Sequence, residues 1–284
     1  MPVIVVGNIS VGGTGKTPLV LWLCDFLTEQ GYAPGIVSRG YGGGGQIMAV
    51  MPSSPPEIVG DEPVLLAMRS RRPVWIGRNR AAAARALIAA HPECNVIVSD
   101  DGLQHYAMAR DFEIAVIDGS RGTGNGLPLP AGPLREGTRR LNRVDAVVIT
   151  GNALAPVAGK PNFGMALEGT MFRNLLNPAF HQDAAAFQGK HVHAIAGIGN
   201  PGRFFDQLQR MTLNFVAHPF PDHHAYSASD LEFANADAII MTEKDAIKCL
   251  PFARENHWVL PVDAVVDTAL GALILEKLQN RHGS

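Results

Sequence analysis

The chain has 284 residues, of which 46% are hydrophobic and 18% are charged, an ordinary composition for a globular protein. Its formal net charge of −2 gives no electrostatic reason to expect nucleic-acid binding. The three cysteines lack the close spacing of a metal site or a redox pair, and no apolar run approaches the roughly 18 residues of a membrane span.

The strongest local signal lies near the N-terminus. An apolar run at residues 3–6 predicts a strand, and apolar residues at helical spacing predict a helix over residues 16–30. The segment between them contains SVGGTGKT, which fits a phosphate-binding loop except that Ser10 replaces the first glycine. We therefore expect polyphosphate binding by backbone N–H groups and side chains at the start of this helix, from Gly12, Gly13, Thr14, Gly15, Lys16 and Thr17. In this pattern the lysine reaches the β- and γ-phosphates and the threonine hydroxyl holds Mg²⁺.

Strands and helices alternate along the rest of the chain. Short β-branched runs predict further strands at residues 36–37, 74–76, 96–98, 114–117 and 146–149, with helices over 63–70 and 78–90. This order predicts an α/β fold of the P-loop NTPase type, with a mostly parallel sheet and helices on both faces. A second alternating series runs from residue 191 to 280. The composition becomes rich in Ala, Pro and Gly near residues 152–161, which is typical of a linker. We therefore expect a nucleotide-binding domain over 1–155 and a smaller α/β domain over 156–284.

Two aspartates, Asp100 and Asp101, directly follow the predicted strand at 96–98. P-loop enzymes place a carboxylate at this position to hold Mg²⁺ or its water shell. Paired aspartates also form simple turns. Beside a phosphate-binding loop, the metal role is favoured.

Another carboxylate, Asp61, has two interpretations. In the segment GDEP it could cap the helix that follows, with Glu62 and Pro63 in the first turn. Alternatively it could orient a histidine as a general base, and the segment FPDHHAY, which contains His223, is the best candidate for that partner. The residue types alone favour the cap.

Arginines cluster in two places. No acidic residue lies between Glu62 and Glu93, a stretch that holds six arginines, and a second group occupies residues 135–143 with Glu136 among it. Each is explained by a solvated helix face, but together they favour an anionic substrate or membrane surface near the nucleotide. The glycine-rich segments 39–45 and 119–137 predict loops that approach a ligand.

Two further motifs have ordinary structural explanations. GIGNPG at residues 197–202 has the form of a dinucleotide-binding turn, with Asp222 about 20 residues on. Pro201, however, lacks an N–H where pyrophosphate would bind, and it suits the first turn of a structural helix. Thr242 to Asp245 matches a helix capping box.

In combination, the motifs resemble one family. Seven segments, spread over nearly the whole chain, resemble in their order the tetraacyldisaccharide 4′-kinases. They are VGNISVGGTGKTPL, SRGYGG, VGDEP, SDDGLQH, DGSRGTGNGLPLPAGPLRE, FPDHHAY and TEKDAI. The resemblance implies transfer of the γ-phosphate of ATP, with Mg²⁺, to the 4′-hydroxyl of tetraacyldisaccharide 1-phosphate, giving lipid IVA. It also implies peripheral attachment to the cytoplasmic face of the Gram-negative inner membrane.

The resemblance assigns roles to individual residues. Asp61 and His223 would form the dyad that accepts the sugar hydroxyl proton, in place of the helix cap, and Lys16 would act on the phosphates. Because the dyad comes from both domains, we expect the domains to close on the substrate. The implied metal ligands are Thr17, Asp100, Asp101 and Glu136. The implied contacts to the lipid head group are Arg39, Tyr41, Arg80, Gln104, His105 and Arg135.

One departure from the family pattern concerns the membrane. Family members usually carry an N-terminal hydrophobic helix, whereas this sequence begins on the P-loop strand. We therefore expect either that the given sequence is a truncation or that its membrane contact comes from other residues. Two rival functions stay open: a P-loop switch ATPase and a kinase for a soluble sugar or coenzyme precursor. The switch ATPases place a signature lysine before the paired glycines, where this chain has Val11.

Overall fold

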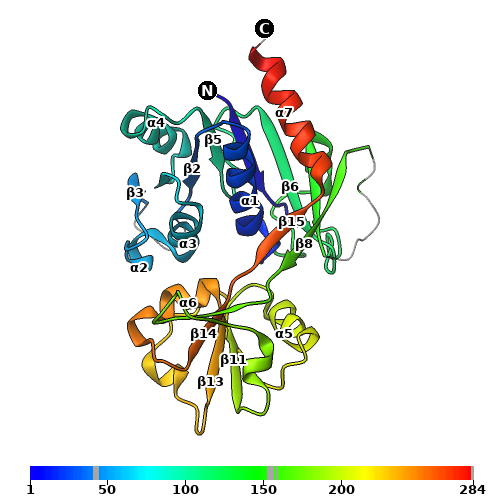
Figure 1. Ribbon diagram of the computed structural model, residues 1–284. Helices are drawn as coiled ribbons and strands as arrows, with labels where there is room; N and C mark the ends of the chain where they lie inside the picture. Colours follow the sequence, from blue (N-terminus) through cyan, green and yellow to red (C-terminus); the bar gives the residue numbers. More distant parts are fainter. Residues whose placement is uncertain (41–44, 152–156, 158, 283–284) are drawn as a thin grey trace. The chain divides into compact units, whose positions relative to one another are not determined.

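A computed structural model describes residues 1–40, 45–151, 157 and 159–282 (Figure 1). Tyr41, predicted to contact the substrate, lies outside the described residues. The chain divides into two compact units. Unit 1 comprises Met1–Leu167 and Asp263–Ser284, and unit 2 comprises Glu168–Val262.

Unit 1 is built on one large sheet with the strand order β15-β8-β7-β6-β1-β5-β2-β4-β3. The strands are β1 Val3–Gly7, β2 Pro34–Ser38, β3 Met48–Val50, β4 Val74–Ile76, β5 Val96–Ser99, β6 Phe112–Asp118, β7 Ala146–Thr150, β8 Asn162–Glu168 and β15 Asp263–Val266. Neighbouring strands from β8 to β4 pair in parallel, and β3 pairs antiparallel with β4. The predicted α/β fold with a mostly parallel sheet is confirmed.

The strand order explains where a ligand would bind in unit 1. The consecutive strands β5 and β6 lie on opposite sides of β1, so the direction in which the sheet is built reverses there. In open α/β sheets, ligands bind beyond the carboxyl ends of the strands at such a reversal. The P-loop follows β1 at this point.

Helices alternate with the strands of unit 1. They are α1 Lys16–Glu29, α2 Pro56–Val59, α3 Asp61–Ser70, α4 Arg80–Ala90 and α7 Thr268–His282, with a 3₁₀ segment at Thr138–Arg143. On α1, Leu19, Leu23 and Leu27 are fully buried, as their spacing predicted.

The C-terminal segment makes the compact units differ from the expected domain ranges. β8 extends the first sheet beyond residue 155, and β15 and α7 return to unit 1, so residues 156–284 are shared between the two units. In Figure 1, α7 (red) lies beside α1 (blue). The two helices approach closely, because a Cβ added to Gly271 of α7 would lie 2.6 Å from the ring of Phe26 in α1. A change of composition along the chain carries no signal of such a return, because the contacts are long-range.

Unit 2 contains a second sheet, with the order β10-β9-β14-β13-β11-β12. Its elements are β9 Phe172–Asn174, β10 His181–Gln182, β11 Val192–Ala196, α5 Pro201–Arg210, β12 Val216–Pro219, β13 Ala238–Thr242, α6 Glu243–Cys249 and β14 His257–Leu260, with 3₁₀ segments at Ala184–Phe187, Ala228–Leu231 and Leu250–Phe252. Strands β12, β11, β13 and β14 are parallel, and β9 is antiparallel to both its neighbours.

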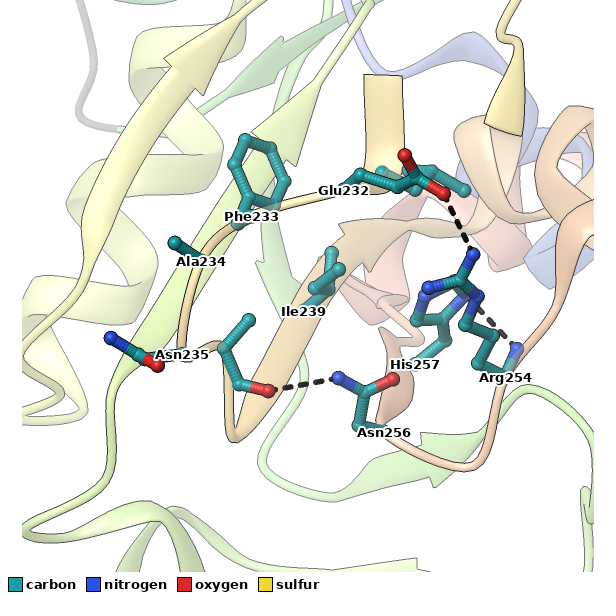
Figure 2. A pocket seen from close by; sticks show the side chains of 10 residues that line it. Glu232, Phe233, Ala234, Asn235, Ile239, Arg254, Asn256 and His257 are labelled. Carbon is teal, nitrogen blue, oxygen red and sulfur yellow. Dashed lines mark hydrogen bonds and ion pairs between the residues drawn. The ribbon is translucent and has the colours of Figure 1, made fainter. Parts of the chain in front are cut away.

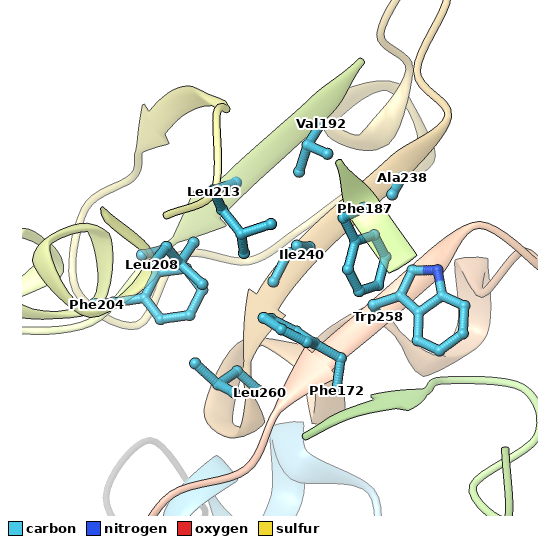
Figure 3. Packing of buried hydrophobic residues seen from close by; sticks show 12 residues of the cluster. Phe172, Phe187, Val192, Phe204, Leu208, Leu213, Ala238, Ile240, Trp258 and Leu260 are labelled. Atoms are coloured by element: carbon cyan, nitrogen blue, oxygen red, sulfur yellow. The ribbon is translucent and has the colours of Figure 1, made fainter. Parts of the chain in front are cut away.

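Aromatic and aliphatic side chains pack together in a core on this second sheet (Figure 3). The Phe187 ring packs edge-on against Phe172 and Trp258, with centroids 5.0 and 5.3 Å apart. Such pairs stabilise a core beyond the burial of their area. Unit 2 therefore has its own hydrophobic core. Among the described residues no helix has the length and apolar character to cross a bilayer.

Candidate active site at the carboxyl edge of the first sheet

The P-loop joins β1 to α1. Gly15 is the N-cap of α1 with φ of 94°, so Lys16 and Thr17 are its first helical residues, and both are buried. The N–H groups of a first helical turn have no partner within the helix, which makes this turn an anion site. Thr150, at the end of β7, donates its hydroxyl to the Thr14 carbonyl at 2.7 Å and fixes the loop from one side.

Lys16 is held by an acid that follows the neighbouring strand β5. Its Nζ lies 3.4 Å from Asp101 Oδ1, and Arg135 Nη1 lies 2.8 and 3.0 Å from the two oxygens of the same carboxylate. Burial acts to raise the pKa of Asp101, but the charges of Lys16 and Arg135 outweigh it and lower that pKa to about 2. Asp101 is therefore ionised and positions both cations.

Asp100 has the opposite environment. It is fully buried, its Oδ2 accepts the Ser38 hydroxyl at 3.1 Å, and its Oδ1 has no hydrogen-bond partner among the described residues. Burial, reinforced by the negative charges of Glu62 and Asp101, raises the pKa of Asp100 to about 7. A buried carboxylate oxygen without a donor fits a cation. Within the described part of the chain no cluster of three or more His, Cys, Asp or Glu side chains forms a ready metal site, so an ion here would take phosphate and water oxygens as well.

Arg80 supports the backbone of both aspartates. It is the first residue of α4 and is buried, and its Nη2 donates to the carbonyls of Asp100 and Asp101 at 3.3 and 2.7 Å. Burial lowers the pKa of this guanidinium. The contacts anchor the turn after β5, a role that the sequence did not predict for this residue.

Glu136, a predicted metal ligand, is already engaged by protein donors. It accepts hydrogen bonds from Gln104 Nε2 at 2.8 Å and from the Tyr106 hydroxyl, and Arg140 Nε lies 3.7 Å away. Gln104 also donates to the Asn8 carbonyl at 3.0 Å, which links this cluster to the P-loop. Tyr106 was missed by the sequence analysis, because no motif distinguishes it from an ordinary exposed aromatic residue.

The remaining predicted residues of unit 1 lie at the same edge of the sheet. Arg39 directly follows β2 and is exposed. Burial and the charges of Arg80, Arg110 and Arg39 lower the pKa of His105. Because these cations act on His105 together, the region is electropositive and suits an anionic group.

Asp61 is not the N-cap of its helix. Gly60, with φ of 91°, holds that position, and Asp61 is the first residue of α3, buried, with Oδ1 accepting the Glu62 N–H at 2.8 Å. The predicted cap is therefore one residue off. Gly60 adopts a backbone conformation that favours glycine and is not helical, and the helix begins at the next residue. Asp61 therefore lies inside the first turn and not at the cap.

His223 lies in the loop after β12 of unit 2. It has φ of 58°, which is uncommon for a residue with a side chain, and its N–H donates to the Gly197 carbonyl at 3.2 Å. The Gly197 N–H in turn donates to the buried Asp245 at 3.1 Å. His223 is thus held in a strained conformation by the turn that follows β11, as functional residues often are.

A cavity of about 510 Å³ opens elsewhere in unit 2 (Figure 2). It lies where the chain enters β13 and β14, and its wall includes Phe233, Arg254 and His257. The His223 loop follows the carboxyl end of β12, at the opposite end of this parallel sheet. Of the predicted site residues that the structure describes, none lines the cavity.

Comparison with known proteins decides the family. A profile of the family described as tetraacyldisaccharide-1-P 4′-kinase matches residues 1–279. The chain belongs to this family. The tetraacyldisaccharide 4′-kinase of Methylobacillus flagellatus is 54% identical, over 98% of this chain and 82% of that protein. The tetraacyldisaccharide 4′-kinase of Azoarcus sp. is 52% identical, over 99% of this chain and 82% of that protein.

A solved structure agrees with the family assignment. The "apo" form of LpxK from Aquifex aeolicus in complex with ATP has a TM-score of 0.80 and 30% identity, and the match covers 98% of this chain and 88% of that one. The predicted family, fold and enzyme class are confirmed. Neither rival is supported by these matches, and the GIGNPG segment leads into α5 with Pro201 in the first turn, as its structural interpretation required.

Proposed function

We propose that this kinase transfers the γ-phosphoryl group of ATP to the 4′-hydroxyl of tetraacyldisaccharide 1-phosphate, forming lipid IVA. The observation that carries the proposal is the pairing of Lys16 with ionised Asp101. It lies beside an Asp100 oxygen that lacks a donor among the described residues, just beyond β5, the strand next to the P-loop strand β1. This arrangement supplies a positioned cation for phosphate and an acidic group for a metal ion.

The nucleotide would be bound by the P-loop. The N–H groups at the start of α1 would meet phosphate oxygens, and Lys16 would neutralise charge on the group in transfer. Mg²⁺, when bound, offsets charge on the β- and γ-phosphates. Thr17 and Asp100 suit it best, because Asp101 is already paired with cations and Glu136 is already engaged by protein donors.

Deprotonation of the sugar hydroxyl is assigned to Asp61 and His223. In the reaction the bond between the γ-phosphorus and its bridging oxygen breaks, the 4′-oxygen bonds to phosphorus, and the hydroxyl proton passes to the base. A positioned base contributes about 10²–10⁴-fold to such a step. The exposed His223 side chain and its strained backbone support a role in binding or catalysis.

The acceptor would be recognised by cations at the same edge of the sheet. Arg39 and Arg135 would supply these charges to the head group and its 1-phosphate, His105 would offer a hydrogen bond as a neutral side chain, and Gln104 would position Glu136. We also propose that the enzyme works at the cytoplasmic face of the inner membrane, where its acylated substrate would lie.

The test is transfer of ³²P from γ-labelled ATP to tetraacyldisaccharide 1-phosphate in detergent micelles. Asp61→Ala and His223→Ala should each lower kcat by about 10²-fold or more, and the double variant should be no worse than the poorer single variant, because a dyad acts as one unit. His181→Ala, an exposed histidine of β10, is the matched control. Absence of labelled lipid from the unaltered chain would refute the proposed function. Equal rates for Asp61→Ala and the unaltered chain would refute the base alone.

A further inference from the structure

Arg121 lies in a tight turn after β6, the strand next to β1. Asp118 ends β6 and is buried, and its carboxylate accepts the Ser120 N–H at 3.0 Å, the Ser120 hydroxyl at 2.6 Å and Arg121 Nε at 3.3 Å. The Gly122 N–H closes the turn on the Asp118 carbonyl at 2.7 Å. Arg121 is thus directed by a buried acid.

The guanidinium of Arg121 lies against the P-loop. Its Nη2 donates to the Gly13 carbonyl at 3.4 Å, and a Cβ on Gly12 would be 3.0 and 3.1 Å from the two terminal nitrogens. Gly12 has φ of 94°. A glycine at this position therefore serves two purposes, the backbone turn and the close approach of the cation.

The position of Arg121 has an electrostatic consequence. A guanidinium presents five N–H donors in a planar fork, which suits the several oxygens of a polyphosphate. The Arg121 side chain is 43% exposed, so a ligand can reach it. Asp118 pairs with the Nε side of the guanidinium, so its terminal nitrogens, which lie at Gly12, are the part that a bound polyphosphate would meet.

Arg121 also brings a positive charge to a part of the P-loop where the sequence itself has an uncharged residue, Val11. P-loop switch ATPases carry a signature lysine just before the paired glycines, and this chain has Val11 there. The guanidinium of Arg121 reaches the adjacent Gly12 from the turn after another strand. The glycine-rich pattern of residues 119–137 predicted a loop that approaches a ligand but gave Arg121 no role of its own, and the pairing of β1 with β6 brings this residue to the P-loop.

We propose that Arg121 contacts the phosphoryl group in transfer and stabilises the charge that develops on it, as an arginine finger supplied by the same chain. The inference rests on the proposed function, since it assigns a further catalytic residue to that reaction. A cation that acts on the transferring group, and not on the nucleoside diphosphate, should affect the transition state far more than the binding of ADP.

The first test is kinetic. Arg121→Ala should lower kcat by about 10²-fold or more while changing the KM for ATP by less than about 3-fold, and Arg121→Lys should recover part of the loss. Arg210→Ala, at an exposed position in the last turn of α5, is the matched control and should retain full activity. Thermal unfolding of each variant separates loss of function from loss of fold.

The second test uses binding and does not depend on the lipid. The affinity of Arg121→Ala for ADP should match that of the unaltered chain, whereas its affinity for ADP with aluminium fluoride, which imitates the group in transfer, should fall by about 10-fold or more. Equal losses for both ligands, or none, would overturn the inference. If the unaltered chain fails to label the lipid, the proposed function fails, and the binding comparison still decides the role of Arg121.

Discussion

The two units use the same strand, turn and helix in opposite ways. After β1 the turn leads to Lys16, and the N–H groups at the start of α1 are left for a ligand. After β11 the similar turn is closed by the protein itself, because the Gly197 N–H donates to Asp245 and α5 begins with Pro201, which has no N–H. A glycine-rich turn is therefore a phosphate site only where the protein leaves its donors open.

Removing the charge from the open turn should have the largest effect. Lys16→Met keeps the apolar stem but removes the cation, and we expect kcat/KM for phosphoryl transfer to fall about 10³-fold. Asp101 keeps Arg135 as a partner, so the thermal midpoint should change little. Lys277→Met, an exposed lysine of α7, is the control, and a similar loss there would contradict the assignment.

Breaking the closed turn should destabilise unit 2. Asp245 is fully buried and lies 3.1 Å from Lys248 Nζ, so Asp245→Asn removes the negative charge beside a largely buried cation. We expect a loss of about 3 kcal/mol in the free energy of unfolding, measured with urea. The double variant Asp245→Asn, Lys248→Met should recover most of it. A double variant as unstable as the single one would assign the effect to the hydrogen bond of Gly197 instead.

Acid should weaken unit 2 through His257. This residue is fully buried and its Nδ1 accepts the Arg254 N–H at 3.2 Å. Burial, reinforced by the charge of Arg254, lowers the pKa of His257 to about 4, below the value of about 6.5 in an unfolded chain. The unfolded state therefore binds the proton first, and stability falls as the pH drops through this window.

The expected loss is about 2 kcal/mol between about pH 7 and pH 5. In a Trp22→Phe, Trp75→Phe background, Trp258 is the remaining tryptophan and reports on unit 2 by fluorescence during urea unfolding. His257→Gln keeps an acceptor without titrating, so its stability should vary less with pH. If the background protein and its His257→Gln variant showed the same dependence of stability on pH, His257 would be ruled out as the titrating group.

Local patterns determined much of this protein. The P-loop, the alternating strands and helices, the buried face of α1, the Pro201 helix start and the Thr242 cap all follow from neighbours in the sequence. These features rest on backbone conformation and on the period of apolar residues, which act over a few residues at a time.

Only the tertiary structure decided the rest. It paired Lys16 with Asp101 and left an oxygen of Asp100 without a donor from the described residues, although the two aspartates are adjacent in the sequence. It returned α7 to unit 1 and brought Arg121 to the P-loop. Such contacts depend on which strands become neighbours in the sheet, and that order is set by packing across the whole unit, not by any local run of residues.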